Sequence, residues 1–153
     1  MHEIKQIPYG VADFISVREQ NLYYVDKTMF LQELEAQPRS LFFIRPRRFG
    51  KSLFISMMRT YYDKSMAGEF DKLFGDLWVG QHPTPLNNRY QVLYLDFSRA
   101  GSNLEHLEEN FNTYCCQRLD DFIDTYRDDY PADMVEELLR LDQSTAKFNL
   151  INN

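Results

Sequence analysis

Apolar and polar positions follow their clearest pattern between residues 40 and 62. Residues 40–44 read Ser-Leu-Phe-Phe-Ile. A short apolar run without alternation is typical of a strand that is buried on both faces of a parallel sheet. After a loop, Leu53, Met57 and Tyr61 recur at helical spacing. The pattern therefore predicts a strand, a loop and then a helix that begins near Gly50 or Lys51.

Another helix is predicted earlier in the chain. Phe30, Leu31 and Leu34 lie at the spacing that places side chains on one side of a helix. Asp26 or Thr28 is expected to cap the start of this helix, because short polar side chains accept hydrogen bonds from the first free amides.

The remaining elements are predicted after residue 89. Residues 90–98 read Tyr-Gln-Val-Leu-Tyr-Leu-Asp-Phe-Ser, which predicts a second strand. Ser102 and Glu105 have the spacing of a capping box, and a long amphipathic helix is expected from there to Tyr126. Pro131 should end it, and a shorter helix should follow.

Charge divides the chain into two parts. Residues 1–102 contain 13 Lys and Arg and 11 Asp and Glu, whereas residues 103–153 contain 4 and 12, and the whole chain has a net charge of −6. We therefore expect residues 103–153 to form an acidic helical segment that repels nucleic acid. The basic side chains gather instead just before Gly50.

Composition indicates a folded protein of the cytoplasm. Hydrophobic residues make up 44% of the chain and aromatic residues 15%, which predicts a packed core. No apolar run approaches the ~20 residues of a membrane span, so no membrane association is expected. Cys115 and Cys116 are adjacent in the chain and are expected to stay free thiols. Free thiols and a polar N-terminus favour the cytoplasm.

Residues 45–52 carry the chemistry that suggests a function. They read Arg-Pro-Arg-Arg-Phe-Gly-Lys-Ser, which ends like the phosphate-binding loop G-x-x-x-x-G-K-[ST]. Gly50 allows the backbone to approach a phosphate closely. The Lys51 ammonium can reach the β- and γ-phosphates, and the Ser52 hydroxyl can bind Mg²⁺.

The first half of this loop departs from the pattern. Arg45 stands where a glycine is expected, and Pro46 biases it towards an extended backbone. The amides of residues 48–52 remain available, and Arg47 and Arg48 add positive charge. Together with Arg45 and Lys51 they give the loop four positive charges, which favour any polyphosphate. Two interpretations therefore stay open: a nucleotide site, or a basic loop that binds nucleic acid or a protein partner.

At this point a resemblance to a known family becomes clear. Residues 7–35, 41–63 and 70–98 together resemble the AAA-ATPase-like family, predicted P-loop ATPases whose loop reads R-P-R-R-F-G-K-S. The resemblance covers about residues 7 to 125. It implies that Arg45 belongs to the family's version of the loop, that the fold is related to AAA+ ATPases, and that ATP and Mg²⁺ are cofactors. It also implies a homo-oligomer or a downstream PD-(D/E)XK nuclease-like domain as partner.

The expected binding residues follow from the loop and the resemblance. Tyr24 lies in a segment that lines the adenine pocket of related ATPases, where it could stack on the base; an aromatic residue at the edge of the core is the equal alternative. Ser52 is the expected metal ligand. The nucleotide-binding residues are Arg45, Pro46, Arg47, Arg48, Phe49, Gly50, Lys51, Ser52, Leu53 and Tyr24.

Asp96 is the candidate catalytic acid. It ends the second predicted strand, and P-loop ATPases hold Mg²⁺ through an acid at a strand end. In additional-strand ATPases, however, another strand intervenes, so Asp96 could lie on the wrong strand. Since no later strand ending in an acidic pair is evident, we expect an N-terminal part of a longer protein, or a truncated product, without ATPase activity of its own.

Together these observations predict an α/β fold. Residues 1–102 would form the N-terminal, incomplete part of an AAA+-like P-loop NTPase domain of sheet and helices, and residues 103–153 its acidic helices. The expected function is ATP binding, as part of an ATPase in the full-length protein. The alternatives are a nucleic-acid or protein-binding module that uses the basic loop, and an inactive remnant.

Overall fold

A computed structural model describes residues 4–37, 40–44, 46, 48–99 and 106–152. The chain divides into two compact units, Met1–Tyr90 and Gln91–Asn153, here called the first and second unit. Each has its own packed helices, and each is described by itself. Within the described residues, no helix has both the length and the apolar character needed to cross a membrane.

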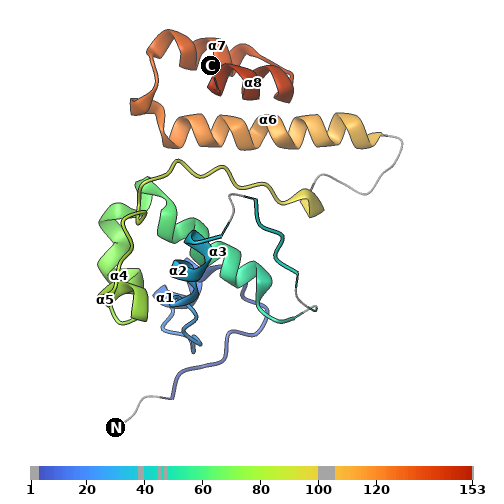
Figure 1. Cartoon of the computed structure of the whole chain (residues 1–153). Coiled ribbons are helices and arrows are strands. Elements are labelled where there is room, and N and C mark those ends of the chain that lie inside the picture. Colours follow the sequence, from blue (N-terminus) through green and yellow to red (C-terminus); the bar gives the residue numbers. More distant parts are fainter. Residues whose placement is uncertain (1–3, 38–39, 45, 47, 100–105, 153) are drawn as a thin grey trace. The chain divides into compact units, whose positions relative to one another are not determined.

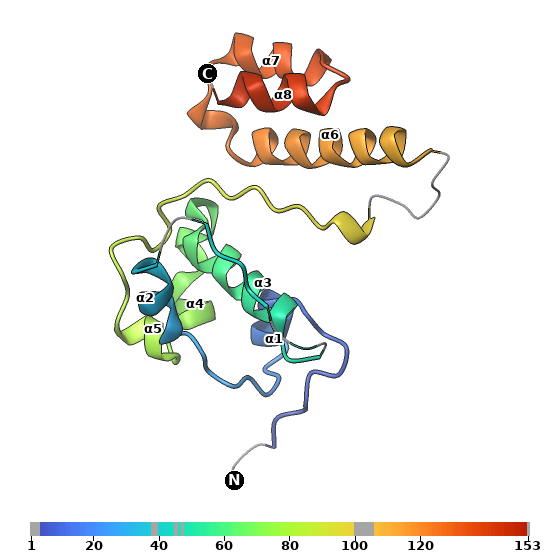
Figure 2. The same ribbon diagram turned by 45° about the vertical axis from the view of Figure 1, so that its right-hand side comes forward.

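The first unit is built around one long helix (Figure 1). This helix, α3, begins directly after the basic loop, and α1 packs against it. Figure 2 shows the same arrangement from a second direction. The helical elements of this unit are α1 (Phe14–Glu19), α2 (Phe30–Glu35), α3 (Lys51–Tyr62), the 3₁₀ helix η1 (Lys64–Glu69), α4 (Phe70–Phe74) and α5 (Trp78–Gln81).

Aromatic side chains form much of the core of the first unit. Phe14 of α1 stacks on Phe74 of α4 with ring centroids 4.9 Å apart, and Tyr61 of α3 meets the same Phe74 ring edge-on at 5.6 Å. Each such pair adds to the area buried from water. The buried core residues are Phe14, Leu31, Phe54, Met57, Tyr61, Leu73, Phe74, Leu77 and Val79.

A polar network ties α2 to α3 at the edge of this core. Glu35 Oε1 accepts hydrogen bonds from the Tyr62 hydroxyl at 3.0 Å and from Thr84 Oγ1 at 2.7 Å. The Tyr61 hydroxyl in turn accepts from the backbone N–H of Thr84 at 2.8 Å. Because the groups are satisfied, the network fixes how the helices pack without a penalty for bare polar atoms.

The α/β prediction is wrong, because the described residues contain helices and no strand. Residues 40–44 belong to no helix or strand, and Phe42 and Ile44 are 93% and 88% exposed instead of buried. The parallel pairing between described residues is one isolated bridge, between Asp63 and Tyr90. An apolar run favours an extended backbone, but a strand also needs a neighbour for its amides and carbonyls.

The second predicted strand, at residues 90–98, is wrong for a related reason. Its extended backbone bonds to tyrosine side chains instead of to another strand. The N–H of Val92 donates to the Tyr126 hydroxyl at 2.9 Å, and the N–H of Asp96 donates to the Tyr114 hydroxyl at 2.6 Å. Both tyrosines belong to or directly follow helix α6, so a helix provides the acceptors that a sheet would otherwise supply.

The second unit is a group of helices in which α7 and α8 lie on one side of the long α6 (Figures 1 and 2). Ile123, Val135 and Leu138 are fully buried between them. Pro131 precedes α7, as predicted. The helical elements are η2 (Phe97–Arg99), α6 (Leu107–Thr125), η4 (Arg127–Asp129), α7 (Ala132–Arg140) and α8 (Ser144–Ile151).

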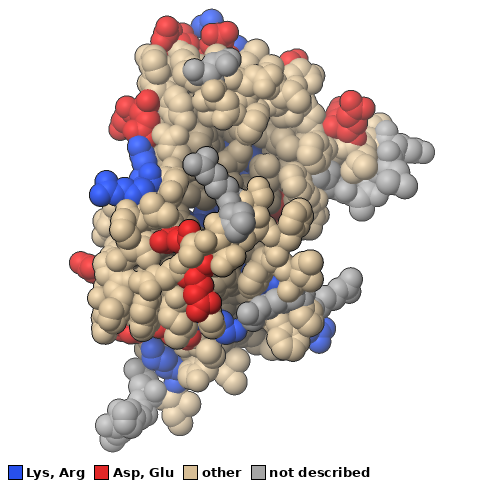
Figure 3. Space-filling model, viewed as in Figure 1, with Lys and Arg blue, Asp and Glu red and all other residues tan. Residues whose placement is uncertain are grey.

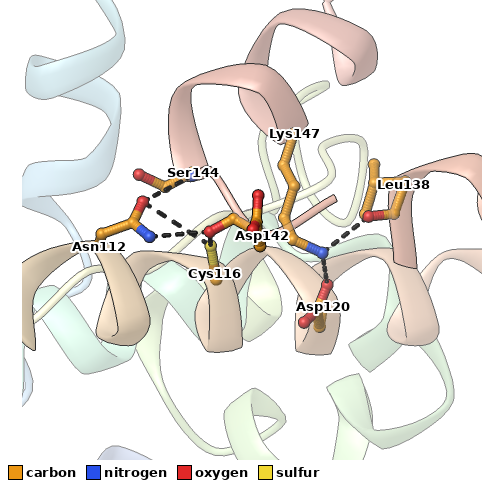
Figure 4. Close-up of polar contacts among 7 residues, drawn as sticks. All are labelled: Asn112, Cys116, Asp120, Leu138, Asp142, Ser144 and Lys147. Atoms are coloured by element: carbon orange, nitrogen blue, oxygen red, sulfur yellow. Dashed lines mark hydrogen bonds and ion pairs between the residues drawn. The ribbon is translucent and has the colours of Figure 1, made fainter. Parts of the chain in front are cut away.

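A buried lysine joins α8 to the other two helices of this unit (Figure 4). The Lys147 ammonium lies 2.5 Å from Asp120 Oδ1 of α6 and donates to the carbonyl oxygen of Leu138 of α7 at 2.7 Å. Beside it, Asn112 accepts from the N–H of Ser144 at 2.8 Å, at the start of α8. These bonds fix the α8 helix, whose own pattern is weakly amphipathic.

Three predicted helices are confirmed, whereas the predicted cap of α2 is wrong. Helices α2, α3 and α7 form where the spacing predicts them. Asp26 and Thr28 do not cap α2, whose N-cap residue is Met29 without a side-chain bond. The predicted capping box, Ser102 and Glu105, lies outside the described residues.

Uncharged surface covers broad areas of the face drawn in Figure 3, with charged side chains scattered between them. Among the described residues, exposed apolar side chains of the first unit include Ile4, Tyr9 and Tyr23. Those of the second unit include Leu107, Phe111 and Phe148. Charge therefore does not mark a single site on this face.

Candidate functional site

The backbone amides at the N-terminus of α3 come directly after the basic loop. Gly50 is its N-cap, with φ 73° and ψ 22° in the left-handed region, and no side chain caps the helix. The first backbone bond runs from the N–H of Phe54 to the carbonyl of Gly50 at 2.9 Å. The amides of residues 51–53 consequently donate to no acceptor within the described part of the chain. Free amides at a helix start, with the helix dipole behind them, are suited to an anion.

The backbone before the helix is also unusual. Arg48 has φ 67°, a left-handed conformation that non-glycine residues seldom adopt. Gly50 is left-handed and Lys51, directly after it, is helical. A left-handed residue next to a helical one is the backbone combination found in anion-binding nests. Gly50 is the position where freedom for positive φ matters, and nothing lies within 4 Å of where its Cβ would stand.

The structure places the predicted loop residues in different environments. Arg48, Phe49, Gly50 and Ser52 are exposed, as is Pro46, whereas Lys51 and Leu53 are half-buried. Leu53 packs against the core, which makes it a residue that holds the helix in place. Arg45 and Arg47, also predicted to bind nucleotide, lie outside the described residues.

Two cavities lie next to the loop, and both belong to the first unit. They share Lys27, Phe49, Gly50 and Phe54. The larger has a volume of about 500 Å³ and is lined also by Ile7, Pro8, Tyr23, Tyr24, Val25, Arg48 and Leu53. The smaller has a volume of about 210 Å³ and is lined also by Phe30, Glu33, Leu34, Gln37 and Phe43. Both combine apolar walls with a few polar groups, as small-molecule sites do.

Tyr24 is both a core residue and a cavity residue. Its ring meets Phe14 edge-on with centroids 5.3 Å apart, and it also lines the larger cavity. Burial raises the pKa of its hydroxyl above the ordinary tyrosine value, and the nearby Asp26 carboxylate adds to the increase. The Tyr24 side chain is therefore neutral and held in place, and its contact with a base stays a prediction.

Lys27 is the cavity residue that the sequence pattern did not reveal. It lines both cavities and is half-buried. The two residues that flank it bond to each other, since Asp26 Oδ1 accepts from the N–H and the hydroxyl of Thr28 at 2.8 and 2.7 Å. An acidic residue two positions before a threonine is the sequence signal of such a turn.

Asp96 and the loop fall in different units. Asp96 Oδ1 accepts hydrogen bonds from the Ser98 N–H at 3.1 Å and from its hydroxyl at 2.7 Å, which closes a local turn. The residue belongs to the second unit, whereas the α3 N-terminus belongs to the first. The role of Asp96 as the acid that holds Mg²⁺ stays a prediction.

Comparison with known proteins gives one extensive match. The model of a protein family described as predicted AAA-ATPases matches residues 8–151. An uncharacterised protein in the vnfD 5′ region of Azotobacter chroococcum mcd 1 is 47% identical over 87 residues, which cover 52% of this chain and 16% of that protein. The chain therefore spans less than one fifth of the length of that relative. No solved structure matches.

Proposed function

Because this chain belongs to the AAA-ATPase-like family of predicted AAA-ATPases, we propose that it binds a nucleoside triphosphate, ATP with Mg²⁺, at the N-terminus of α3. One observation carries the proposal. Left-handed Gly50 is followed at once by a twelve-residue helix that has Lys51 as its first residue, and its first amides have no acceptor among the described residues. This is the local backbone that a phosphate group requires.

The charged residues of the loop, the Ser52 hydroxyl and the first amides of α3 have proposed roles. The amides of residues 51–53 bind phosphate oxygens, and the Lys51 ammonium neutralises the β- and γ-phosphates. The Ser52 hydroxyl, exposed at the helix start, binds Mg²⁺. Arg48 adds positive potential, and Arg45 and Arg47 are proposed to do the same.

The larger cavity is proposed to hold the base and ribose. Its volume of about 500 Å³ falls within the range of ~300–1,000 Å³ that is usual for ligand pockets. Tyr24 is fixed by the core at one wall, and Tyr23 is exposed at the same cavity. An aromatic wall suits the flat face of a base.

Hydrolysis of the bound nucleotide is a further part of the proposal. The loop positions phosphates, but turnover also needs an acid for Mg²⁺ and a group that orients the attacking water. Asp96 is the proposed acid, and no residue is assigned to the water. Binding is thus the activity for which this chain's own geometry offers the stronger support.

ATP titration tests the binding proposal. Labelled ATP is titrated into the protein with Mg²⁺ or with a chelator, for the wild type, Lys51→Ala and Lys72→Ala. We expect Lys51→Ala to weaken ATP binding by about 10- to 100-fold, the usual effect of losing a hydrogen bond to a charged group. Lys72 lines neither cavity and pairs with Glu19 and Glu69 on the surface, so its loss should leave affinity unchanged.

The same titration distinguishes nucleotide binding from the alternative function, nucleic-acid binding. Equal ATP affinity in the wild type and in Lys51→Ala would contradict the proposal, provided that thermal melts show both proteins folded. Salt-sensitive binding of a single-stranded oligonucleotide that ATP does not displace would favour the nucleic-acid alternative.

A further inference from the structure

The turn at residues 26–28 is fixed from two directions. Asp26 Oδ1 accepts from Thr28, and Asp26 Oδ2 accepts from the N–H of Trp78 at 2.7 Å. The fully buried Thr28 hydroxyl accepts from the N–H of Val79 at 3.1 Å. Both Trp78 and Val79 lie in the first turn of α5, so the turn is attached to a helix as well as closed on itself.

Lys27, the middle residue of this turn, lines both cavities. Its neighbours on both sides face the α5 amides, whereas Lys27 lines both cavities next to Phe49 and Gly50. Within the described residues, no hydrogen bond or ion pair involves the Lys27 ammonium. Both cavities have mainly apolar walls, with Glu33 in the smaller and Arg48 in the larger. A charged group in such surroundings is more stable with a partner of opposite charge, which an anionic ligand would provide.

We propose that Lys27 contacts the phosphate chain of the bound nucleotide as a second ammonium, and that Asp26 and Thr28 position it by holding the turn on α5. This inference rests on the proposed function. It places a cation on a segment separate in sequence from the loop, so that the phosphates lie between the α3 amides and the residue 26–28 turn.

A structural role for Lys27 makes a different prediction. Lysine stems often cover apolar surface while the charged end stays in water. Lys27→Met keeps most of the stem and removes only the charge, so a covering role would survive this change. A phosphate contact would not survive it, but Lys27→Arg would keep most of the contact.

The first experiment measures the affinity of three ligands for four proteins: the wild type, Lys27→Met, Lys27→Arg and the surface control Lys72→Met. The ligands are labelled ATP, inorganic tripolyphosphate as a competitor, and adenosine. We expect Lys27→Met to weaken ATP and tripolyphosphate alike, by about 10-fold or more, as for a hydrogen bond between charged groups. Adenosine affinity should stay within about twofold, because adenosine lacks phosphate. Lys27→Arg should retain most of the affinity, and Lys72→Met all of it.

Failure of this inference differs from failure of the proposed function. If Lys51→Ala weakens ATP and Lys27→Met does not, the Lys27 contact is wrong and the site stands. An equal loss of adenosine and ATP would also overturn the phosphate contact. If wild type binds neither ATP nor tripolyphosphate, the proposed function fails and the inference fails with it.

Thr28→Val tests the positioning role. Valine has nearly the shape of threonine but lacks the hydroxyl that bonds to Asp26 and to the N–H of Val79. We expect an intermediate loss of ATP affinity, about threefold to tenfold, and no further loss when Thr28→Val is added to Lys27→Met. Additive losses in the double variant would show that Thr28 does not act through Lys27. Melting curves of each variant check that the fold is kept.

Discussion

Removing Asp120 should destabilise the second unit more than removing the lysine that it partners. The Lys147 side chain is 1% exposed, whereas that of Asp120 is 36% exposed. Asp120→Ala leaves a buried ammonium that, among the described residues, keeps its bond to the Leu138 carbonyl alone. Breaking a buried ion pair in this way costs about 3–5 kcal/mol, and the partial exposure of Asp120 favours the lower end of this range.

Lys147→Met should cost much less. Methionine fills a similar volume without a charge, and replacing buried ionic groups by apolar side chains of similar volume is often close to neutral. The partly exposed Asp120 carboxylate can be hydrated, and the Leu138 carbonyl keeps the bond from the N–H of Leu141 at 3.2 Å. Adding Lys147→Met to Asp120→Ala should therefore recover most of the lost stability, because the stranded charge is gone.

Urea unfolding followed by far-UV circular dichroism measures these free energies. Asp121→Ala is the matched control, since Asp121 also lies on α6 but pairs with Arg118 at the surface, where a pair contributes about 0–1 kcal/mol. Trp78, the chain's one tryptophan, reports the first unit by fluorescence. The reasoning is refuted if Asp120→Ala costs no more than Asp121→Ala, or less than Lys147→Met.

Two further predictions concern the first unit. Gly50→Ala should destabilise it by about 1–2 kcal/mol in the same urea assay, because a residue with a Cβ is strained in the left-handed backbone conformation. Gly68→Ala is the control and should not destabilise the unit, since an added Cβ there also meets no atom within 4 Å and Gly68 has no positive φ. Burial and the bond to Glu35 raise the pKa of Tyr62 above its ordinary value of 10.0, so stability should fall as the pH rises above about 10, where the unfolded chain ionises and the folded chain does not. Tyr62→Phe should flatten this fall between pH 9 and 11, and an unchanged slope would contradict it.

The helices whose patterns are local were predictable from the sequence. The start of α3 follows from a glycine and the apolar spacing after it, and the start of α7 follows from Pro131. Both depend on residues within one or two turns of the boundary. The candidate site lies at such a boundary, so its position in the chain follows from the same local pattern, while its role stays a proposal.

The features that depend on distant partners could not be predicted in the same way. The sequence of residues 91–96 suits a strand, but the acceptors of its backbone amides come from elsewhere in the chain. They are the hydroxyls of Tyr114 and Tyr126 and not a neighbouring strand. Asp26 and Thr28 have the chemistry of helix caps, and their partners are instead the amides of α5, about fifty residues away. The cavity position of Lys27 is a consequence of those same bonds.

This difference between local and distant features bears on what the chain can do. An anion site at a helix start needs the backbone of a few consecutive residues, and left-handed Gly50 before α3 is the stretch proposed for it here. Phosphoryl transfer also requires groups from separate segments to be held around the phosphates. Lys27 is such a group within the first unit, whereas Asp96 belongs to the second. Affinity for the phosphate chain should therefore respond to Lys51, Lys27 and the turn that holds Lys27, and should be measurable independently of any turnover.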